Sequence, residues 1–134
     1  MYRVRQSATK ILFAFGLSVL ASVPVNAADL ASPVGRWQTA TGESRYEVSY
    51  CGGGQQICAK LTWLRSDART PENLAYLNRL VVRGAEATSN NKWQGVISFD
   101  GQSIPGRMTL VDKDKMVLKG CQVIFCQTVE FERI

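Results

Sequence analysis

The strongest constraint on this chain is a pair of segments in which every second residue is apolar, separated by a glycine-rich turn. Before the turn at residues 51–54, the alternating apolar positions are Tyr46, Val48 and Tyr50. After the turn, they are Ile57, Ala59, Leu61 and Trp63. A period of two is typical of strands with one buried face, whereas an amphipathic helix repeats every 3.6 residues. The pattern therefore predicts a β-hairpin.

Strand patterns and tight turns recur along the rest of the chain. Asp100-Gly101 is the strongest two-residue hairpin signal, and Thr41-Gly42 ends the first candidate strand. The remaining candidate strands lie at residues 34–39, 93–99, 104–110, 116–118 and 128–133. Together with the first hairpin, these segments predict seven or eight strands.

One segment interrupts the strands with a helical pattern. Thr70 is a candidate N-cap, Pro71 suits the first helical position, and leucines follow at positions 74, 77 and 80. We expect a short helix of about ten residues over 71–81, between the third and fourth strands. A polar stretch at 87–91 then separates this segment from the next candidate strand.

These elements predict an all-β fold. Consecutive strands joined by short turns pair as neighbours, and a long meander must close or fold over to protect its edges. We therefore expect a small up-and-down antiparallel β-barrel of about eight strands with one short helix. A barrel of this size is either filled by its own side chains or holds one small ligand.

The first 27 residues have the pattern of a cleaved secretory signal peptide. Arg3, Arg5 and Lys10 precede an apolar run at 11–23, and small residues at 25 and 27 mark a cut after Ala27. The run has about 13 residues, whereas a membrane-spanning helix needs about 20. No cysteine follows the cut to carry a lipid anchor. We expect a single domain at 28–134, periplasmic or secreted, without stable membrane insertion.

Removal of the signal peptide changes the charge of the chain. The whole sequence carries a formal charge of +5, but residues 28–134 hold 13 basic and 11 acidic side chains. Such a small excess gives no electrostatic reason to expect nucleic acid or an anionic membrane as the main partner.

The chain contains no histidine, and this absence limits its chemistry. Ser-His-Asp and Cys-His catalytic arrangements are excluded, and the commonest metal ligand is missing. Asp112 and Asp114 are a candidate acid pair, but flanking lysines indicate a solvated turn. We expect no catalytic residues, no metal and no cofactor.

All four cysteines fall in the part that would be exported, where an even number usually indicates disulfides. They are Cys51, Cys58, Cys121 and Cys126. Three connectivities are open, and we favour the two local pairs, 51 with 58 and 121 with 126, because each closes a short loop between strands. A four-thiolate zinc site is the alternative, although its ligands are normally closer in sequence.

The predicted strands direct a set of apolar and aromatic side chains inward. The set comprises Trp37, Tyr46, Val48, Tyr50, Leu61, Trp63, Trp93, Ile97, Phe99, Met108, Leu110, Leu118 and Phe131. Within the barrel and at its mouth, the candidate ligand contacts are Tyr46, Tyr50, Trp63, Tyr76, Trp93 and Phe99. A core that these side chains simply fill is the alternative.

Short sequence motifs of the chain resemble those of two known families. Gly35-Arg36-Trp37 resembles the G-x-W pattern of lipocalins and related barrels, which implies that Arg133 packs over Trp37 as a structural clamp.

A wider likeness is to an exported bacterial family catalogued as domain of unknown function 2147. Its words are VGRW (34–37), YEV (46–48), YCGG (50–53), ICAKLTWL (57–64), WQG (93–95) and LKG (118–120). The likeness implies a lipocalin-like barrel and transfers no catalytic residue. Ala59 replaces a usual glycine, and the second cysteine pair is an addition.

The sequence therefore favours a noncatalytic barrel that binds a small apolar or amphipathic molecule in its interior. The alternative is a protein-interaction module, such as an inhibitor of a secreted protease, that acts through its loops.

Overall fold

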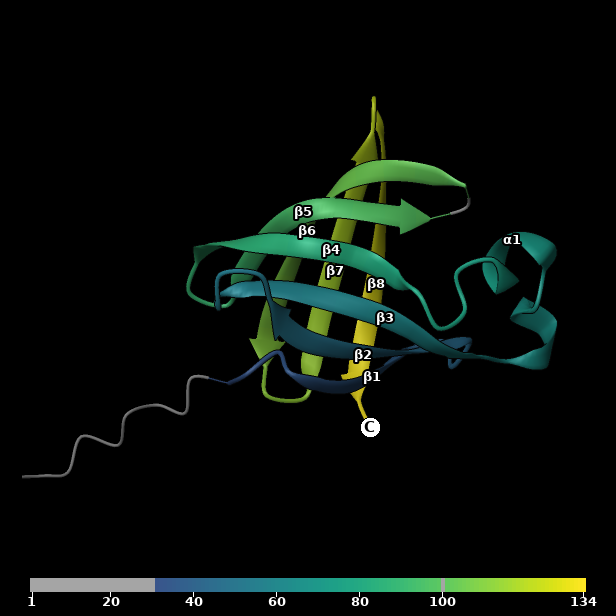
Figure 1. The fold of residues 1–134 in the computed structure, drawn as a ribbon, viewed down its shortest axis with the longest axis horizontal. Coiled ribbons are helices and arrows are strands. Elements are labelled where there is room, and N and C mark those ends of the chain that lie inside the picture. Colours follow the sequence, from purple (N-terminus) through teal and green to yellow (C-terminus); the bar gives the residue numbers. More distant parts are fainter. Residues whose placement is uncertain (1–30, 100) are drawn as a thin grey trace, which may run out of the picture.

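The protein is a closed barrel of eight antiparallel strands in the order β1 to β8 (Figure 1). The computed structural model describes residues 31–99 and 101–134, without the side chain of Phe99. The proposed signal peptide and its cut after Ala27 lie outside the described residues. The expected fold class, an up-and-down barrel with one short helix between β3 and β4, is confirmed.

Each strand pairs with its neighbours in the chain, and β1 closes the barrel by pairing with β8. The strands are β1 (Gly35–Thr39), β2 (Ser44–Cys51), β3 (Gln56–Leu64), β4 (Leu80–Ser89), β5 (Lys92–Phe99), β6 (Gln102–Asp112), β7 (Lys115–Gln122) and β8 (Phe125–Arg133). Between β3 and β4 lie the 3-10 turn η1 (Ser66–Ala68) and the helix α1 (Pro71–Leu74).

The helix is shorter than its leucine spacing predicts. Thr70 caps it as expected, because its hydroxyl accepts a hydrogen bond from the Asn73 backbone N–H at 3.2 Å. The chain then leaves the helical conformation at Asn78, whose φ is 61°, and Asn78 N–H bonds to the Leu61 carbonyl on β3. Pairing with β3 thus takes the place of further helical turns. The expectation of a helix to residue 81 was wrong, because α1 ends at Leu74 and β4 begins at Leu80. β4 also includes most of the polar stretch at 87–91.

Alternating strand directions give the barrel two different ends. At the end that we call the closed end lie residues 31–34 and the turns β2–β3, β4–β5 and β6–β7. At the other, the open end, lie the turns β1–β2, β5–β6 and β7–β8 together with the helical β3–β4 connection. Figure 1 shows α1 beside the strands at this open end.

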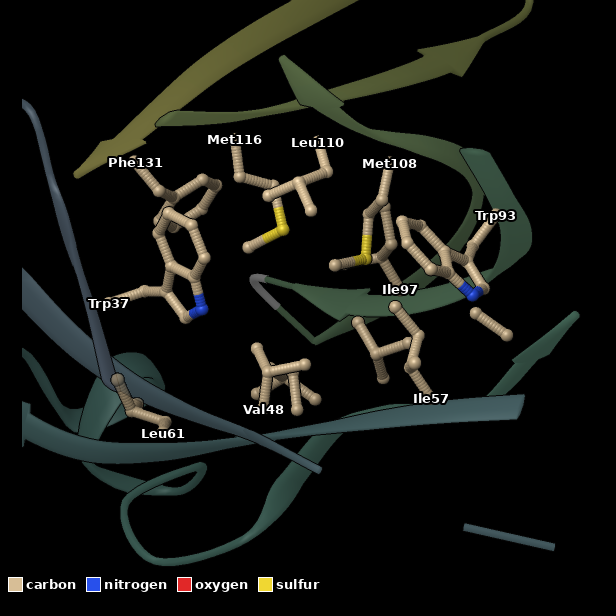
Figure 2. Close-up of a cluster of buried hydrophobic side chains, with 14 of the residues drawn as sticks. Trp37, Val48, Ile57, Leu61, Trp93, Ile97, Met108, Leu110, Met116 and Phe131 are labelled. Atoms are coloured by element: carbon tan, nitrogen blue, oxygen red, sulfur yellow. The ribbon is translucent and has the colours of Figure 1, made fainter. Parts of the chain in front are cut away.

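Large side chains fill the closed end. Trp37 is completely buried, and its indole N–H donates to the Pro33 carbonyl at 2.8 Å. The Trp93 indole N–H donates to the Gln55 carbonyl at 3.3 Å. Figure 2 shows both tryptophans directed toward the same cluster as Ile57. Because both N–H groups are bonded, these indoles contribute apolar burial without an unpaired donor.

Arg133 lies across Trp37, the contact that the G-x-W likeness implies. Its Cζ is 4.3 Å from the centre of the ring. The guanidinium donates to the carbonyls of Val34 at 2.8 Å, Ser32 at 2.6 Å and Lys113 at 2.6 Å. One side chain therefore joins the segment before β1 to the β6–β7 turn, beside the seam where β1 meets β8.

Both local cysteine pairs form disulfides, as expected from the sequence. Cys51–Cys58 joins β2 to β3 near the closed end. Cys121–Cys126 joins directly opposed residues of β7 and β8 near the open end. Two hairpins are thus covalently fixed in register.

Replacing the two side chains of the Trp37–Arg133 clamp with alanine, one at a time, should lower the free energy of unfolding by different amounts. Trp37→Ala is expected to lower the free energy of unfolding by about 3 to 5 kcal/mol, because it leaves a large buried cavity. Arg133→Ala should cost about 1 to 2 kcal/mol, because its hydrogen bonds are partly solvated. Urea denaturation measures both.

Arg36→Ala is the control, because Arg36 is exposed on the same strand as Trp37, and it should change stability by less than about 0.5 kcal/mol. An unchanged midpoint for Trp37→Ala would contradict the role of β1 in closing the barrel.

Nonreducing peptide mapping of protein from an oxidising compartment should find Cys51 joined to Cys58, Cys121 joined to Cys126, and no free thiol. In the chain-entropy model each short loop stabilises the fold by about 2 to 2.5 kcal/mol, so reductant should lower the unfolding midpoint. A bond between the two hairpins, or four free thiols with bound zinc, would refute this pairing.

Candidate functional site

The half of the barrel next to the open end is hollow. It encloses a cavity of about 530 Å³ that opens to the outside. Side chains from every strand line it, and the buried apolar ones include Val48, Ala59, Leu61, Leu64, Val82, Ile97, Met108, Met116 and Phe131. The residues that fill the closed end, Trp37, Ile57, Trp93 and Leu110, do not line it. The barrel is therefore filled at one end and hollow at the other.

The cavity opens partly through a gap beside β8. β1 pairs with β8 only from Trp37↔Arg133 to Thr39↔Phe131, and one more bond joins Ala40 N–H to the Glu130 carbonyl at 2.8 Å. Within the described residues, no strand pairs with the same edge of β8 between 125 and 129. Residues 127–130 line the cavity, as does the β1–β2 turn at 40, 41 and 43. The opening therefore lies between this turn and the first half of β8.

Polar side chains surround the mouth, and its two carboxylates are paired. Glu43 lies 3.7 Å from the Arg65 guanidinium, and Glu130 lies 3.3 Å from the Lys115 ammonium. Both pairs are exposed, so each contributes little to stability. Because each pair joins a carboxylate to a basic group, the rim of the mouth is hydrophilic but has no large excess of either charge.

The polar groups inside the wall already have partners. Thr39 Oγ1 accepts hydrogen bonds from the backbone N–H groups of Glu43 at 3.0 Å and Ser44 at 3.2 Å. The Ser44 hydroxyl donates to the Tyr46 hydroxyl at 3.2 Å. In the part of the chain that the structure describes, no buried side-chain nitrogen or oxygen lacks a partner. A ligand in the cavity therefore does not need to supply hydrogen bonds to the polar groups of the inner wall.

Tyr46 contributes a partly buried aromatic ring to this wall. Its ring meets Phe131 edge to face, with centroids 5.4 Å apart and planes at 87°. Burial raises the pKa of Tyr46 above its usual value, because the phenolate would be poorly solvated there. The phenol stays neutral at physiological pH and adds no charge to the cavity.

Tyr76 lies at the mouth, in the connection that follows α1, and it lines the cavity. Its hydroxyl accepts a hydrogen bond from the Gly101 backbone N–H at 2.9 Å. This bond joins the β3–β4 connection to the β5–β6 turn, so two loops at the open end hold each other in place.

Tyr50, Trp63 and Trp93, three of the other aromatic candidates, do not line this cavity. Tyr50 was expected to point inward, but it is 50% exposed, because β1 pairs with β2 only as far as Val48. Trp63 was also expected inside, but a register shift near Tyr46 changes the alternation, and the ring stacks under Arg45 at 4.4 Å on the outside.

Trp93 points inward as expected but belongs to the filled end. Tyr50 and Trp93 instead line a second, more open hollow of about 480 Å³ between the segment before β1 and the β2–β3 and β4–β5 turns, with neutral polar residues at 88–91. Phe99 ends β5, and its side chain lies outside the described part of the structure.

Sequence reasoning missed three kinds of lining residue. Thr39 and Ser44 continue the alternation of their strands, so a pattern read without regard to polarity would have found them. Val82 lies on β4, which carried no recognisable strand pattern. Gly120 lines the cavity beside Ile104, whose Cδ1 would lie 2.8 Å from a Cβ at this position. Glycine here makes room for a cavity-lining isoleucine.

Within residues 31–99 and 101–134, no three His, Cys, Asp or Glu side chains come together as a metal site. None of the helices described there is long and apolar enough to cross a membrane.

Comparison with known proteins gives a family for this barrel. No curated protein and no solved structure shows significant similarity to the chain. One family model matches residues 35–133, which run from the first residue of β1 to the last residue of β8. The match covers most of the chain and includes nearly all the sequence words that carry the likeness. The chain belongs to the family described as "uncharacterized protein conserved in bacteria (DUF2147)".

Proposed function

We propose that this protein is an exported, noncatalytic binding protein that holds a small apolar or amphipathic molecule inside the barrel. The observation that carries the proposal is the open cavity of about 530 Å³. Its size lies within the range of about 300 to 1,000 Å³ that is typical of small-molecule sites. Its lining is mainly aliphatic, with a few hydroxyl groups, which is also typical of such sites.

The distribution of polar groups favours an amphipathic ligand in one orientation. The inner wall is apolar, and its hydroxyls are engaged with each other or with backbone groups. An apolar chain can enter there without competing for hydrogen bonds. At the mouth, Asn73 and Gln127 offer amide groups to a polar head. The apolar part should therefore enter first, with the head left near the rim.

The lining offers little for catalysis. Its carboxylates, Glu43 and Glu130, lie at the rim in exposed ion pairs, and Tyr46, whose pKa is raised by burial, is held neutral. General acid–base catalysis needs a group whose pKa lies near the working pH. A binding role therefore accounts for this cavity better than a reaction does.

Export is part of the proposal. Disulfides form and persist in oxidising compartments, and this barrel has two of them. The N-terminal sequence pattern of a signal peptide agrees with a periplasmic or secreted location.

A fluorescent apolar probe, N-phenyl-1-naphthylamine, tests the cavity directly. It should bind the folded protein saturably near one equivalent. Ala59→Leu and Leu118→Phe should each weaken binding by about tenfold, because each adds bulk to the cavity lining. Titration followed by probe emission measures the affinity, and circular dichroism checks the fold. Two variants are needed because either one alone can disturb the core.

Val96→Leu is the matched control, because Val96 is exposed on the outer face of β5. It should leave the affinity unchanged. If the probe does not bind, or if all three variants bind it equally well, the cavity is not the site. That result would favour the alternative function, a protein-interaction module or protease inhibitor that acts through its loops.

A further inference from the structure

We propose that the tip of the β7–β8 hairpin is a membrane-contacting element, which inserts shallowly into a phospholipid surface and brings the cavity mouth to it. This inference rests on the proposed function, because it identifies where the apolar ligand comes from. The ligand class is then a lipid or another molecule that is dissolved in the bilayer.

The tip consists of Val123, Ile124 and Phe125. Their exposed fractions are 93%, 83% and 76%, the highest of the exposed large apolar residues in the described structure. Single apolar residues at a surface need no explanation, but three consecutive ones on a projecting turn form a patch. Figure 1 shows this hairpin extending past the neighbouring strands. The patch therefore projects from the barrel into solvent.

The turn itself is an unfavourable place for these residues. Val123 has a φ of 55°, a region that β-branched side chains rarely adopt. Two-residue hairpin turns normally use asparagine, aspartate or glycine there, which would be both soluble and unstrained. The protein thus combines backbone strain with apolar exposure at one point, and such a combination is typical of functional positions.

The stem below the tip holds it rigidly. Cys121 and Cys126 are directly opposed in the β7–β8 register and joined by a disulfide, two residues from the turn on one strand and two on the other. A rigid tip loses little conformational entropy when it inserts, so more of the gain from apolar burial is kept.

The size and charge of the tip favour a membrane over a protein partner. A stable protein interface uses about 20 to 30 residues on each side, and three side chains fall far short of that number. From Leu118 to Val129 the hairpin carries only one charged side chain, Lys119, and no carboxylate. Nothing on it would be repelled by phosphate groups or would lose a charge interaction on entering the interface.

The depth of insertion is limited by the open edge of β8. Residues 125–129 have no strand partner on that edge among the described residues, and unpaired backbone groups are costly in hydrocarbon. Only the tip can enter. Contact is therefore shallow and reversible, as for an apolar residue set at the level of the lipid headgroups.

The tip lies on the route into the cavity. Side chains alternate along β8, so Phe125 shares the inner face with Gln127, Val129 and Phe131, which all line the cavity. The mouth opens along this same stretch of the strand. A bilayer that holds the tip would thus lie next to the mouth, and an apolar molecule would cross little water on its way in.

Sedimentation with vesicles of phosphatidylcholine, with and without phosphatidylglycerol, tests the inference. The disulfide-bonded protein should sediment with both, and 0.5 M salt should change this little, because the contact is apolar. Ile124→Asp should reduce association by about tenfold or more. Ile124→Leu should retain it, and Val96→Asp, on the exposed barrel wall, should have no effect.

The probe titration separates this inference from the proposed function. Ile124→Asp should bind N-phenyl-1-naphthylamine in solution as tightly as the unsubstituted protein, but it should take the probe from loaded vesicles more slowly. If the unsubstituted protein binds the probe but sediments no more than Ile124→Asp, the membrane contact is refuted and the cavity stands. Association that needs phosphatidylglycerol and disappears in salt would also refute it. So would a dimer in vesicle-free solution that Ile124→Asp abolishes, because the tip would then bind a second copy.

Discussion

The contact of Arg133 with Trp37 stabilises the seam between β1 and β8, which is the weakest strand pairing of the barrel. β1 is the shortest strand, and it meets β8 over only three residue pairs. The indole supplies apolar burial beneath this seam, and the guanidinium supplies hydrogen bonds to carbonyls before β1 and in the β6–β7 turn. Gly35 is part of the arrangement, because a Cβ there would overlap the arginine.

This closure explains how so small a domain can be hollow. An empty cavity sacrifices packing, and the loss must be offset elsewhere in the fold. Here both buried tryptophans lie at the closed end, while the other half is lined mainly by aliphatic residues, with Tyr46 and Phe131 among them. The same short β1 that makes the seam weak leaves the first half of β8 unpaired, and so creates the opening. Stability and access thus depend on one structural feature.

The sequence predicted much of the fold, and its failures have clear causes. Strong alternation and tight turns located seven strands, but β4 was missed because its first residues continue the helical leucine spacing and its last residues are polar. Of the aromatic candidates whose side chains the structure describes, Tyr46 and Tyr76 reach the cavity. Trp63 does not, because a register shift that leaves no mark in the alternation turns it outward.

By itself, the sequence determined the strand-rich class, the local disulfides and the tryptophan–arginine pair, because all of these depend on residue type and short spacing. Only the tertiary structure decided which half of the barrel is filled and where the wall opens. Those properties depend on strand register and on the relative lengths of β1 and β8, which are distant in the chain. An alternating pattern assigns each side chain to one face of the sheet. Closure of the barrel then determines how many other side chains it contacts on that face.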